Sequence, residues 1–332
     1  MSYVVRGRKY FASLLLILAV VLSIGVTGYG KESLPVFKVS DDDWTYIARE
    51  KGWLDKAFAA DGTKVTITEV PSSGTEGALF ERGDLHITER MFYPAYVFKT
   101  NGYDLSIVDV SKHPGPEIVS IIVPADSPAK SFSDLKGKKI ASARTGCASI
   151  VLFEMAEKLN WEYNVDFKYY NIPSSEYKAA LLAKEIDAIS SHPSTNVVTL
   201  LLNGLAREIE HPSNDSMYIQ GGGVYVNITP TAFARKYPNT IKKYLKIRYQ
   251  TFDWIKNNQD EAAAIIQRIR RVPPEVSKYV WKSRFATWTP EHSYATVVAE
   301  AERTQDWLIN HGDVKPEKRV DIKRFIDKQF FQ

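Results

Sequence analysis

Apolar and polar residues alternate along the chain with two different periods. Short runs rich in β-branched residues, such as residues 36–39 and 64–70, have the period of strands, whereas residues 44–58 have apolar positions at helical spacing. Further strands are predicted at 118–123, 139–144, 186–189 and 224–227, and further helices at 230–237, 239–257, 260–269 and 290–310. This alternation is typical of an α/β fold with mostly parallel sheets flanked by helices.

Small polar residues follow three of the predicted strands. The segments 71–75, 145–149 and 190–193 contain Ser, Thr, Gly or His, and a helix is predicted to begin within or after each of the first two. Open α/β sheets bind small ligands at the carboxyl ends of their strands, where the unpaired backbone N–H groups of helix N-termini point outward. We therefore expect these three loops to form a binding site.

Two positions in the sequence are suited to hinges. Pro124 and Pro128 bound a short extended segment, and three consecutive glycines occupy residues 221–223. Segments of this kind absorb changes in backbone conformation where a chain crosses between lobes. The predicted division is into a signal peptide, a first lobe, an inserted second lobe and a return to the first lobe with C-terminal helices, at residues 1–30, 31–123, 124–222 and 223–332.

The first thirty residues have the pattern of a secretory signal peptide. Arg6, Arg8 and Lys9 precede an apolar run over residues 11–26, and small residues up to Gly28 suit the cleavage site. A permanent membrane anchor is the alternative, although a full span usually needs about 20 apolar residues. Cleavage near Gly28 would release the mature chain into the periplasm.

Composition narrows the class of protein further. Of the 332 residues, 44% are apolar and 25% are charged, which is typical of a globular chain. Most of the net charge of +4 comes from the basic residues of the predicted leader, so the mature chain gives no electrostatic reason to bind nucleic acid. Cys147 is the only cysteine, which excludes an intrachain disulfide and a lipid-modified cysteine after the leader.

Four phrases of the sequence resemble the substrate-binding components of ABC importers for taurine, aliphatic sulfonates and nitrate. They occur in that family's order and consist of residues 46–52 (YIAREKG), 132–140 (FSDLKGKKI), 177–188 (YKAALLAKEIDA) and the helical region 233–263. The resemblance implies the type II periplasmic binding-protein fold, in which two lobes joined by two hinge crossovers enclose the ligand.

The resemblance also implies which residues contact the ligand. By position they are Trp44, Ser73, Gly74 and Thr75 in the first lobe and Thr145, Gly146, Cys147, Ala148 and His192 in the second. A departure from the family's pattern follows residue 87, where Glu89 and Arg90 introduce charge. Arg90 would suit a ligand with a negative group, because guanidinium groups form bidentate hydrogen bonds with oxyanions. Tyr225 is expected to line an apolar part of the site.

Structural roles remain open for several of these residues. The hydroxyls of Ser73 and Thr145 could serve only as helix caps. Arg90 could form a salt bridge with Glu89 or another acid, and His192 could be a hydrogen-bonded structural residue. Cys147 is not accompanied by the His and Asn that a thiol nucleophile needs, and His192 has no metal-ligand companion close in the sequence.

The sequence therefore predicts a periplasmic protein that captures a small, sulfonate-like organic anion for an ABC importer by closure of two lobes. We expect a monomer that has no catalytic activity, cofactor or metal and whose partner is a permease in the cytoplasmic membrane. The open alternatives are a nitrogenous heterocycle such as a thiamine precursor, an aromatic carboxylate, or a sensor that signals to a membrane partner. An enzyme resembling hydroxymethylpyrimidine synthases would need a cysteine-rich iron-binding motif, and the chain has one cysteine.

Overall fold

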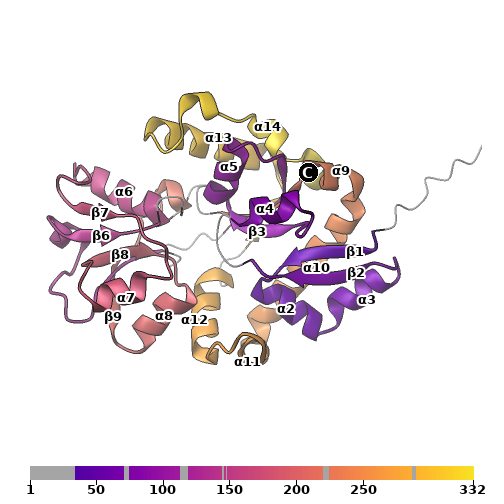
Figure 1. Ribbon diagram of the computed structural model, residues 1–332, viewed down its shortest axis with the longest axis horizontal. Coiled ribbons are helices and arrows are strands. Elements are labelled where there is room, and N and C mark those ends of the chain that lie inside the picture. The colour runs from indigo at the N-terminus through magenta and orange to yellow at the C-terminus, as the bar shows by residue number, and fades with distance from the viewer. Residues whose placement is uncertain are drawn as a thin grey trace, which may run out of the picture. The chain divides into compact units, whose positions relative to one another are not determined.

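Three sheets contain the strands of the described residues (Figure 1). The computed structural model describes residues 34–70, 75–112, 119–143, 146, 148–219, 224–285 and 289–332, with the side chains of 283–285 excepted. The predicted signal peptide lies outside these ranges. Residues 35–332 form one compact unit.

The elements follow the predicted alternation. The strands are β1 Val36–Ser40, β2 Lys64–Thr68, β3 Thr88–Met91, β4 Leu105–Lys112, β5 Ser120–Pro124, β6 Lys139–Ala141, β7 Lys168–Tyr170, β8 Ala188–Ser191, β9 Ala206–Glu210, β10 Tyr225–Pro230 and β11 Thr289–Pro290. The helices are α2 Asp43–Glu50, α3 Trp53–Ala59, α4 Glu76–Glu81, α5 Phe92–Thr100, α6 Ala148–Lys158, α7 Tyr177–Leu182, α8 Thr195–Leu202, α9 Thr231–Lys236, α10 Pro238–Asn257, α11 Gln259–Arg270, α12 Pro274–Phe285, α13 Tyr294–Asn310 and α14 Ile322–Phe325, with short 3-10 turns at Phe132–Leu135, Pro316–Lys318 and Lys328–Phe330. None of these helices is long and apolar enough to cross a membrane.

The two halves of the molecule share one strand order. The five-stranded sheet runs β7-β6-β8-β5-β9, with β6 parallel to β7 and β8, and β5 antiparallel to both of its neighbours. In the other half, β1 and β2 are parallel, and a parallel bridge between Val39 and Ile87 connects β1 to the segment that leads into β3. There β10 lies antiparallel between β3 and β4, so the order β2-β1-β3-β10-β4 repeats that of the five-stranded sheet.

The α/β class with mostly parallel sheets is as predicted, and in each half one strand of the repeated order runs opposite to the other four. At the sheet edge, β11 also pairs antiparallel with β4. Within the repeated strand order the reversed strands are β5 and β10, which are the first strands after the chain has crossed from the other sheet. β5 begins beside the carboxyl end of β8, with Ser120 opposite Ser191. A strand that starts at the carboxyl edge of its parallel neighbours must run back toward their amino ends, which explains both antiparallel strands.

The first crossing between sheets lies earlier than residue 124, where the sequence suggested a hinge. The residues of β5 are buried and pair on both sides within the five-stranded sheet, so this strand belongs to the inserted half and not to the end of the first lobe. The crossing therefore falls between β4 and β5, and Pro124 ends β5. The return crossing falls between β9 and β10, and the glycines at 221–223 lie there, outside the described residues.

Buried apolar side chains connect the two larger sheets. One cluster contains Ile107 and Val226 from the four-stranded sheet together with Ile121 and Ile140 from the five-stranded sheet. Trp44 lies elsewhere, on the inner face of α2, with its ring centroid 4.9 Å from that of Tyr244 on α10. The helical period of residues 44–58 is interrupted at Gly52, whose positive φ of 71° separates α2 from α3.

Candidate functional site

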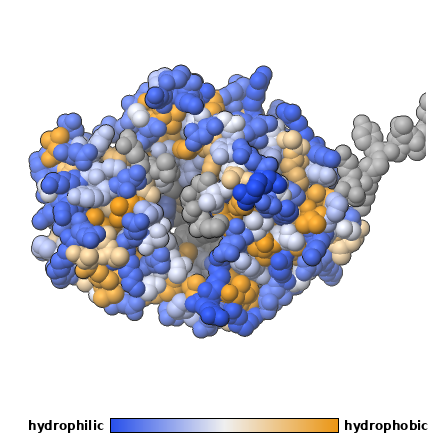
Figure 2. All heavy atoms as spheres, viewed as in Figure 1, coloured by the Kyte–Doolittle hydropathy of each residue, from blue (hydrophilic) through white to orange (hydrophobic). Residues whose placement is uncertain are grey.

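A cavity of about 400 Å³ is lined by residues from both larger sheets. The face of the molecule shown in Figure 2 is mostly hydrophilic, and it is hollowed between the elements of the five-stranded sheet and those of the other sheets. The residues that line the cavity are Asp42, Glu89, Arg90, Met91, Pro94, Ser142, Ala143, Gly146, Ala148, Ser174, Tyr177, Ser191, His192, Pro193, Ser194, Tyr225 and Val280. The cavity is therefore a candidate for a ligand that contacts both halves of the protein.

The five-stranded sheet contributes the ends of two neighbouring strands. β6 and β8 are parallel, so Ser142 and Ala143 after β6 lie at the same edge as Ser191 and His192 at the end of β8. The backbone N–H of Ala143 donates to the hydroxyl of Tyr177 at 2.9 Å. Tyr177 is 2% exposed, and burial raises the pKa of its phenol. This tyrosine thus holds the start of the loop between β6 and α6 against α7.

Two further hydrogen bonds hold the start of α6 at the cavity. The hydroxyl of Ser190 donates to the carbonyl of Ala148 at 2.7 Å, and the hydroxyl of Ser149 donates to the carbonyl of Gly146 at 2.8 Å. Gly146 has little free space around it, since a Cβ there would lie 3.1 Å from the carbonyl oxygen of Ala143. A side chain at residue 146 would therefore require a small shift of the Ala143 backbone, whatever the ligand is.

Arg90 lines the cavity from β3, but its charge already has a partner. Its guanidinium forms an ion pair with Glu76 of α4, which is fully buried, and donates to the carbonyl of Glu89 at 3.0 Å. The side chain of Arg90 is 21% exposed. The sequence left two roles open for Arg90. The salt bridge is formed, with Glu76 rather than with the carboxylate of Glu89, and Arg90 is also one of the residues that line the cavity.

A buried network of charges lies behind this wall. Arg248 of α10 is 0% exposed and pairs with Glu89 and with Asp109, whose carboxylate accepts from Nη1 at 2.9 Å. Asn227 also donates to Asp109, at 3.1 Å, and Tyr249 donates its hydroxyl to the same carboxylate. Burial, with the Asp109 charge beside it, raises the pKa of Tyr249 far above its usual value. The network fixes β3, β4 and β10 relative to α10.

One pattern in the sequence singles out Arg248. In α10 the buried positions include Ile241, Tyr244, Leu245, Thr251 and Phe252, and Arg248 falls on the same face at helical spacing. A charged residue on the apolar face of a helix needs a buried counterion. The signal indicates such a partner but cannot say that Glu89 and Asp109 provide it.

His192 lines the cavity from the end of the five-stranded sheet, and Tyr225 lines it from the four-stranded sheet. The Nδ1 atom of His192 lies 3.3 Å from the hydroxyl of Tyr218, and the two ring centroids are 5.8 Å apart. Tyr225 is the first residue of β10, directly after the return crossing. The hydrogen bond to Tyr218 supports a structural role for His192. His192 also lines the cavity.

The predicted site residues divide into three groups. Arg90, Gly146, Ala148, His192 and Tyr225 line the cavity together. Trp44 and Thr75 do not: Trp44 is 1% exposed in the core, and Thr75 is the residue before α4. The remaining four lie outside the described residues, namely Ser73, Gly74, Thr145 and Cys147.

Trp44 lies in the core because of its helix's amphipathic pattern. Trp44, Ile47 and Ala48 are all buried on one face of α2, which packs on α10. The ring of Trp44 lies 6.1 Å from that of Phe252. The expected aromatic contact at Trp44 is therefore a core contact in this structure, and the aromatic side chains at the cavity are instead Tyr177, His192 and Tyr225.

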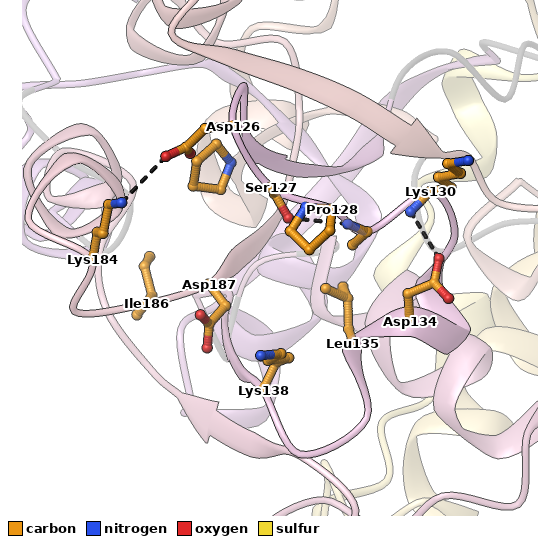
Figure 3. Close-up of a pocket in the computed structure, with 12 residues that line it drawn as sticks. Asp126, Ser127, Pro128, Lys130, Asp134, Leu135, Lys138, Lys184, Ile186 and Asp187 are labelled. Atoms are coloured by element: carbon orange, nitrogen blue, oxygen red, sulfur yellow. Dashed lines mark hydrogen bonds and ion pairs between the residues drawn. The ribbon is translucent and has the colours of Figure 1, made fainter.

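A second cavity, of about 590 Å³, lies at the opposite edge of the five-stranded sheet (Figure 3). Its lining includes Lys138 and Asp187, which precede β6 and β8 and so lie at their amino ends. Figure 3 shows Lys184 paired with Asp126, at 3.2 Å. All the lining residues come from the inserted half of the chain, so this cavity cannot bring the two sheets together around a ligand.

Within the described ranges, no group of three or more His, Cys, Asp or Glu side chains is arranged to hold a metal ion. The buried carboxylates Glu76, Glu89 and Asp109 are each paired with an arginine instead.

This chain is similar to several proteins that are named for the solutes they bind. A Bacillus subtilis (strain 168) protein, assigned by its name to the aliphatic sulfonates-binding proteins, is 23% identical over 288 residues, which are 86% of this chain and 83% of that one. The periplasmic aliphatic sulphonate binding protein SsuA of Escherichia coli superposes with a TM-score of 0.77 at 19% identity, over 89% of this chain and 92% of that one. The alkanesulfonate-binding protein SsuA of Xanthomonas axonopodis pv. citri, bound to MOPS, gives 0.76 at 18% identity, over 89% and 99%.

These structural matches show the periplasmic binding-protein fold, and the three relatives are named for binding rather than catalysis. A family model described as NMT1/THI5 like matches residues 44–262, a range that runs from α2 through both larger sheets into α11. Because this match covers more than half of the sequence, the chain belongs to the NMT1/THI5-like family.

Proposed function

We propose that this protein is the periplasmic solute-binding component of an ABC importer and that it captures a small organic anion of the sulfonate type. The observation that carries the proposal is the cavity lined from both sheets. A ligand that contacts both halves binds the closed state better than the open state and shifts the equilibrium toward closure. The permease would then distinguish the closed, loaded protein from the open one.

The cavity residues from the inserted half of the chain support the binding of an anionic head group. Ser194 precedes α8, and its buried hydroxyl has no hydrogen-bond partner within the described part of the chain. The N-terminus of a helix attracts negative charge through its unpaired N–H groups and its dipole. A sulfonate oxygen placed there would accept from the Ser194 hydroxyl, with His192 and Arg90 as further donors at the cavity wall.

One observation favours a second candidate, a neutral or cationic nitrogenous heterocycle. The charge of Arg90 is balanced by Glu76, and the carboxylate side chain of Asp42 lines the same cavity. The charged side chains that line the cavity in the described ranges therefore do not form a positive site. Arg144, which follows Ala143 in the sequence, lies outside those ranges.

A thermal-shift screen of residues 31–332 separates the two candidates. The solutes are MOPS, linear alkanesulfonates, taurine, nitrate, benzoate and a hydroxymethylpyrimidine. A solute present at 100 times its dissociation constant should stabilise the native state by about 2.7 kcal/mol, which is a readily measured shift. We expect the sulfonates to stabilise the protein, and a shift only with the pyrimidine would contradict the anion proposal.

A matched pair of variants then tests the head-group contact. Ser194→Ala should weaken sulfonate binding about tenfold, because hydrogen bonds to charged groups are among the stronger ones. Thr199→Ala is the control: its hydroxyl lies on the same helix but donates to the carbonyl of Thr195 at 2.7 Å. Equal sulfonate affinities of the two variants would show that Ser194 does not contact the head group. Loss of uptake of the same solute in cells that lack the protein tests the importer part of the proposal.

A further inference from the structure

α12 connects the two halves of the molecule after both chain crossings have been made. It follows α11 in the C-terminal part of the chain and packs against it, and it also packs against α8 of the inserted half. Figure 1 shows α12 between α8 and α11. Val276, Ser277 and Trp281 are buried, with Trp281 only 1% exposed, so the helix is anchored by its own side chains.

One hydrogen bond joins α12 directly to the five-stranded sheet. The hydroxyl of Tyr279 donates to Oε2 of Glu208 on β9 at 3.2 Å, while Oε1 of Glu208 accepts from the hydroxyl of Ser120 at 2.8 Å. Both oxygens of this carboxylate therefore accept a hydrogen bond, one from β5 and one from α12. The position of α12 at the sheet is set by a defined contact rather than by loose packing.

The residue next to Tyr279 reaches the ligand cavity. Val280 lines the cavity and is, within the described ranges, its only lining residue that follows Tyr225 in the sequence. The polar groups of the cavity, including Ser194 and His192, come from other elements. The cavity therefore combines an aliphatic side chain with polar loops, and an amphiphilic ligand needs both, one for its tail and the other for its head group.

We infer that α12 forms the wall against which the apolar tail of the ligand packs, that Val280 limits the length of that tail, and that the bond between Tyr279 and Glu208 holds this wall in place. The inference rests on the proposed function and goes beyond it by assigning chain-length selection to a C-terminal helix. Val280 is the residue that would touch the ligand, and Tyr279 is a positioning residue.

The first test measures affinities for linear alkanesulfonates from methanesulfonate to octanesulfonate. In the wild-type protein each methylene that becomes buried should tighten binding about fourfold, until the tail reaches the α12 wall. Val280→Phe should move that limit to shorter tails and weaken octanesulfonate binding about tenfold, with methanesulfonate unchanged. Val280→Ala should move the limit to longer tails. Lys282→Ala, at an exposed position on the same helix, is the control.

The second test needs no ligand. Tyr279→Phe removes the donor to Glu208 and should raise amide hydrogen exchange along α12 about tenfold, since a hydrogen bond to a charged group is lost. The same variant should make the chain-length limit less sharp, which a merely structural weakening elsewhere would not do. Glu275→Ala, exposed on α12, should leave both measurements unchanged.

The outcomes distinguish the inference from the proposed function. An unchanged chain-length profile in Val280→Phe and Val280→Ala, with normal binding by the wild-type protein, would overturn the tail wall and leave the proposed function standing. Exchange in α12 that does not respond to Tyr279→Phe would overturn the positioning role. Absence of alkanesulfonate binding by the wild-type protein would contradict the proposed function itself.

Discussion

At the scale of single residues, a buried arginine that does not line the cavity positions a carboxylate that does. Arg248 is wholly buried, and its guanidinium donates to Glu89 through Nε at 2.8 Å and to the hydroxyl of Ser111 at 3.1 Å. Glu89 lies beside Arg90 on β3 and also lines the cavity. The side-chain position of Glu89 at the cavity is thus determined by an arginine on α10.

Replacement of Arg248 should therefore be severe. Arg248→Met leaves the carboxylates of Glu89 and Asp109 buried without their counterion, and breaking a buried pair in this way typically costs about 3–5 kcal/mol. Urea unfolding at neutral pH measures the loss. Arg268→Met is the control, because Arg268 pairs with Glu50 where both side chains are about half exposed, 58% and 46%, and such pairs contribute less than about 1 kcal/mol. Similar losses in the two variants would contradict the importance of the buried network.

At the scale of elements, α4 is a short helix whose first two residues are both tightly packed. Its first residue, Glu76, is the buried partner of Arg90, and its second, Gly77, lies against the ring of Tyr103 so closely that a Cβ would overlap it. Glycine is required at residue 77 because the ring of Tyr103 occupies the space of a side chain, and not because of the backbone conformation. A side chain at this position would have to move either Tyr103 or the helix that carries Glu76.

A double-mutant cycle tests this close packing. Gly77→Ala should destabilise the protein by about 1–3 kcal/mol through overpacking. In a Tyr103→Ala background the same change should cost little, because the ring that it would meet is gone. Chemical denaturation of the four proteins gives the coupling. Equal costs of Gly77→Ala in both backgrounds would show that its effect comes from the helix backbone and not from Tyr103.

At the scale of the whole molecule, the two sheets share a core. The cluster that contains Ile107 and Val226 continues to Ile121 and Ile140 without a break, although the chain crosses between these sheets twice. α12 adds a contact between the halves through Tyr279 and Glu208. Residues 35–332 should therefore unfold together rather than half by half.

Calorimetry of residues 31–332 tests this cooperativity. We expect one thermal transition whose van't Hoff and calorimetric enthalpies agree, and a bound solute should move the entire transition to higher temperature. Two transitions, of which only one responds to the solute, would show that the halves are independent and that the shared cluster does not couple them.

The sequence by itself determined the local elements and the class of protein. Residues 36–39 and 239–257 were predicted as a strand and a helix, and they lie in β1 and α10, because periodicity and end signals act between near neighbours in the chain. The family phrases likewise indicated the fold that the structural matches show. His192 was proposed from its position after a predicted strand and Arg90 from a departure from the family's pattern after residue 87, and both line the cavity.

Only the tertiary structure decided the long-range partners. The apolar strand β5 was compatible with either sheet until its pairing with β8 and β9 was known. Trp44 could have faced a ligand or the core, and the choice was made by Tyr244, 200 positions later in the numbering. Whether Arg90 was a free cation depended on Glu76. Burial, charge pairing and sheet membership are set by contacts between distant segments, and such contacts leave no periodic signal in the local sequence.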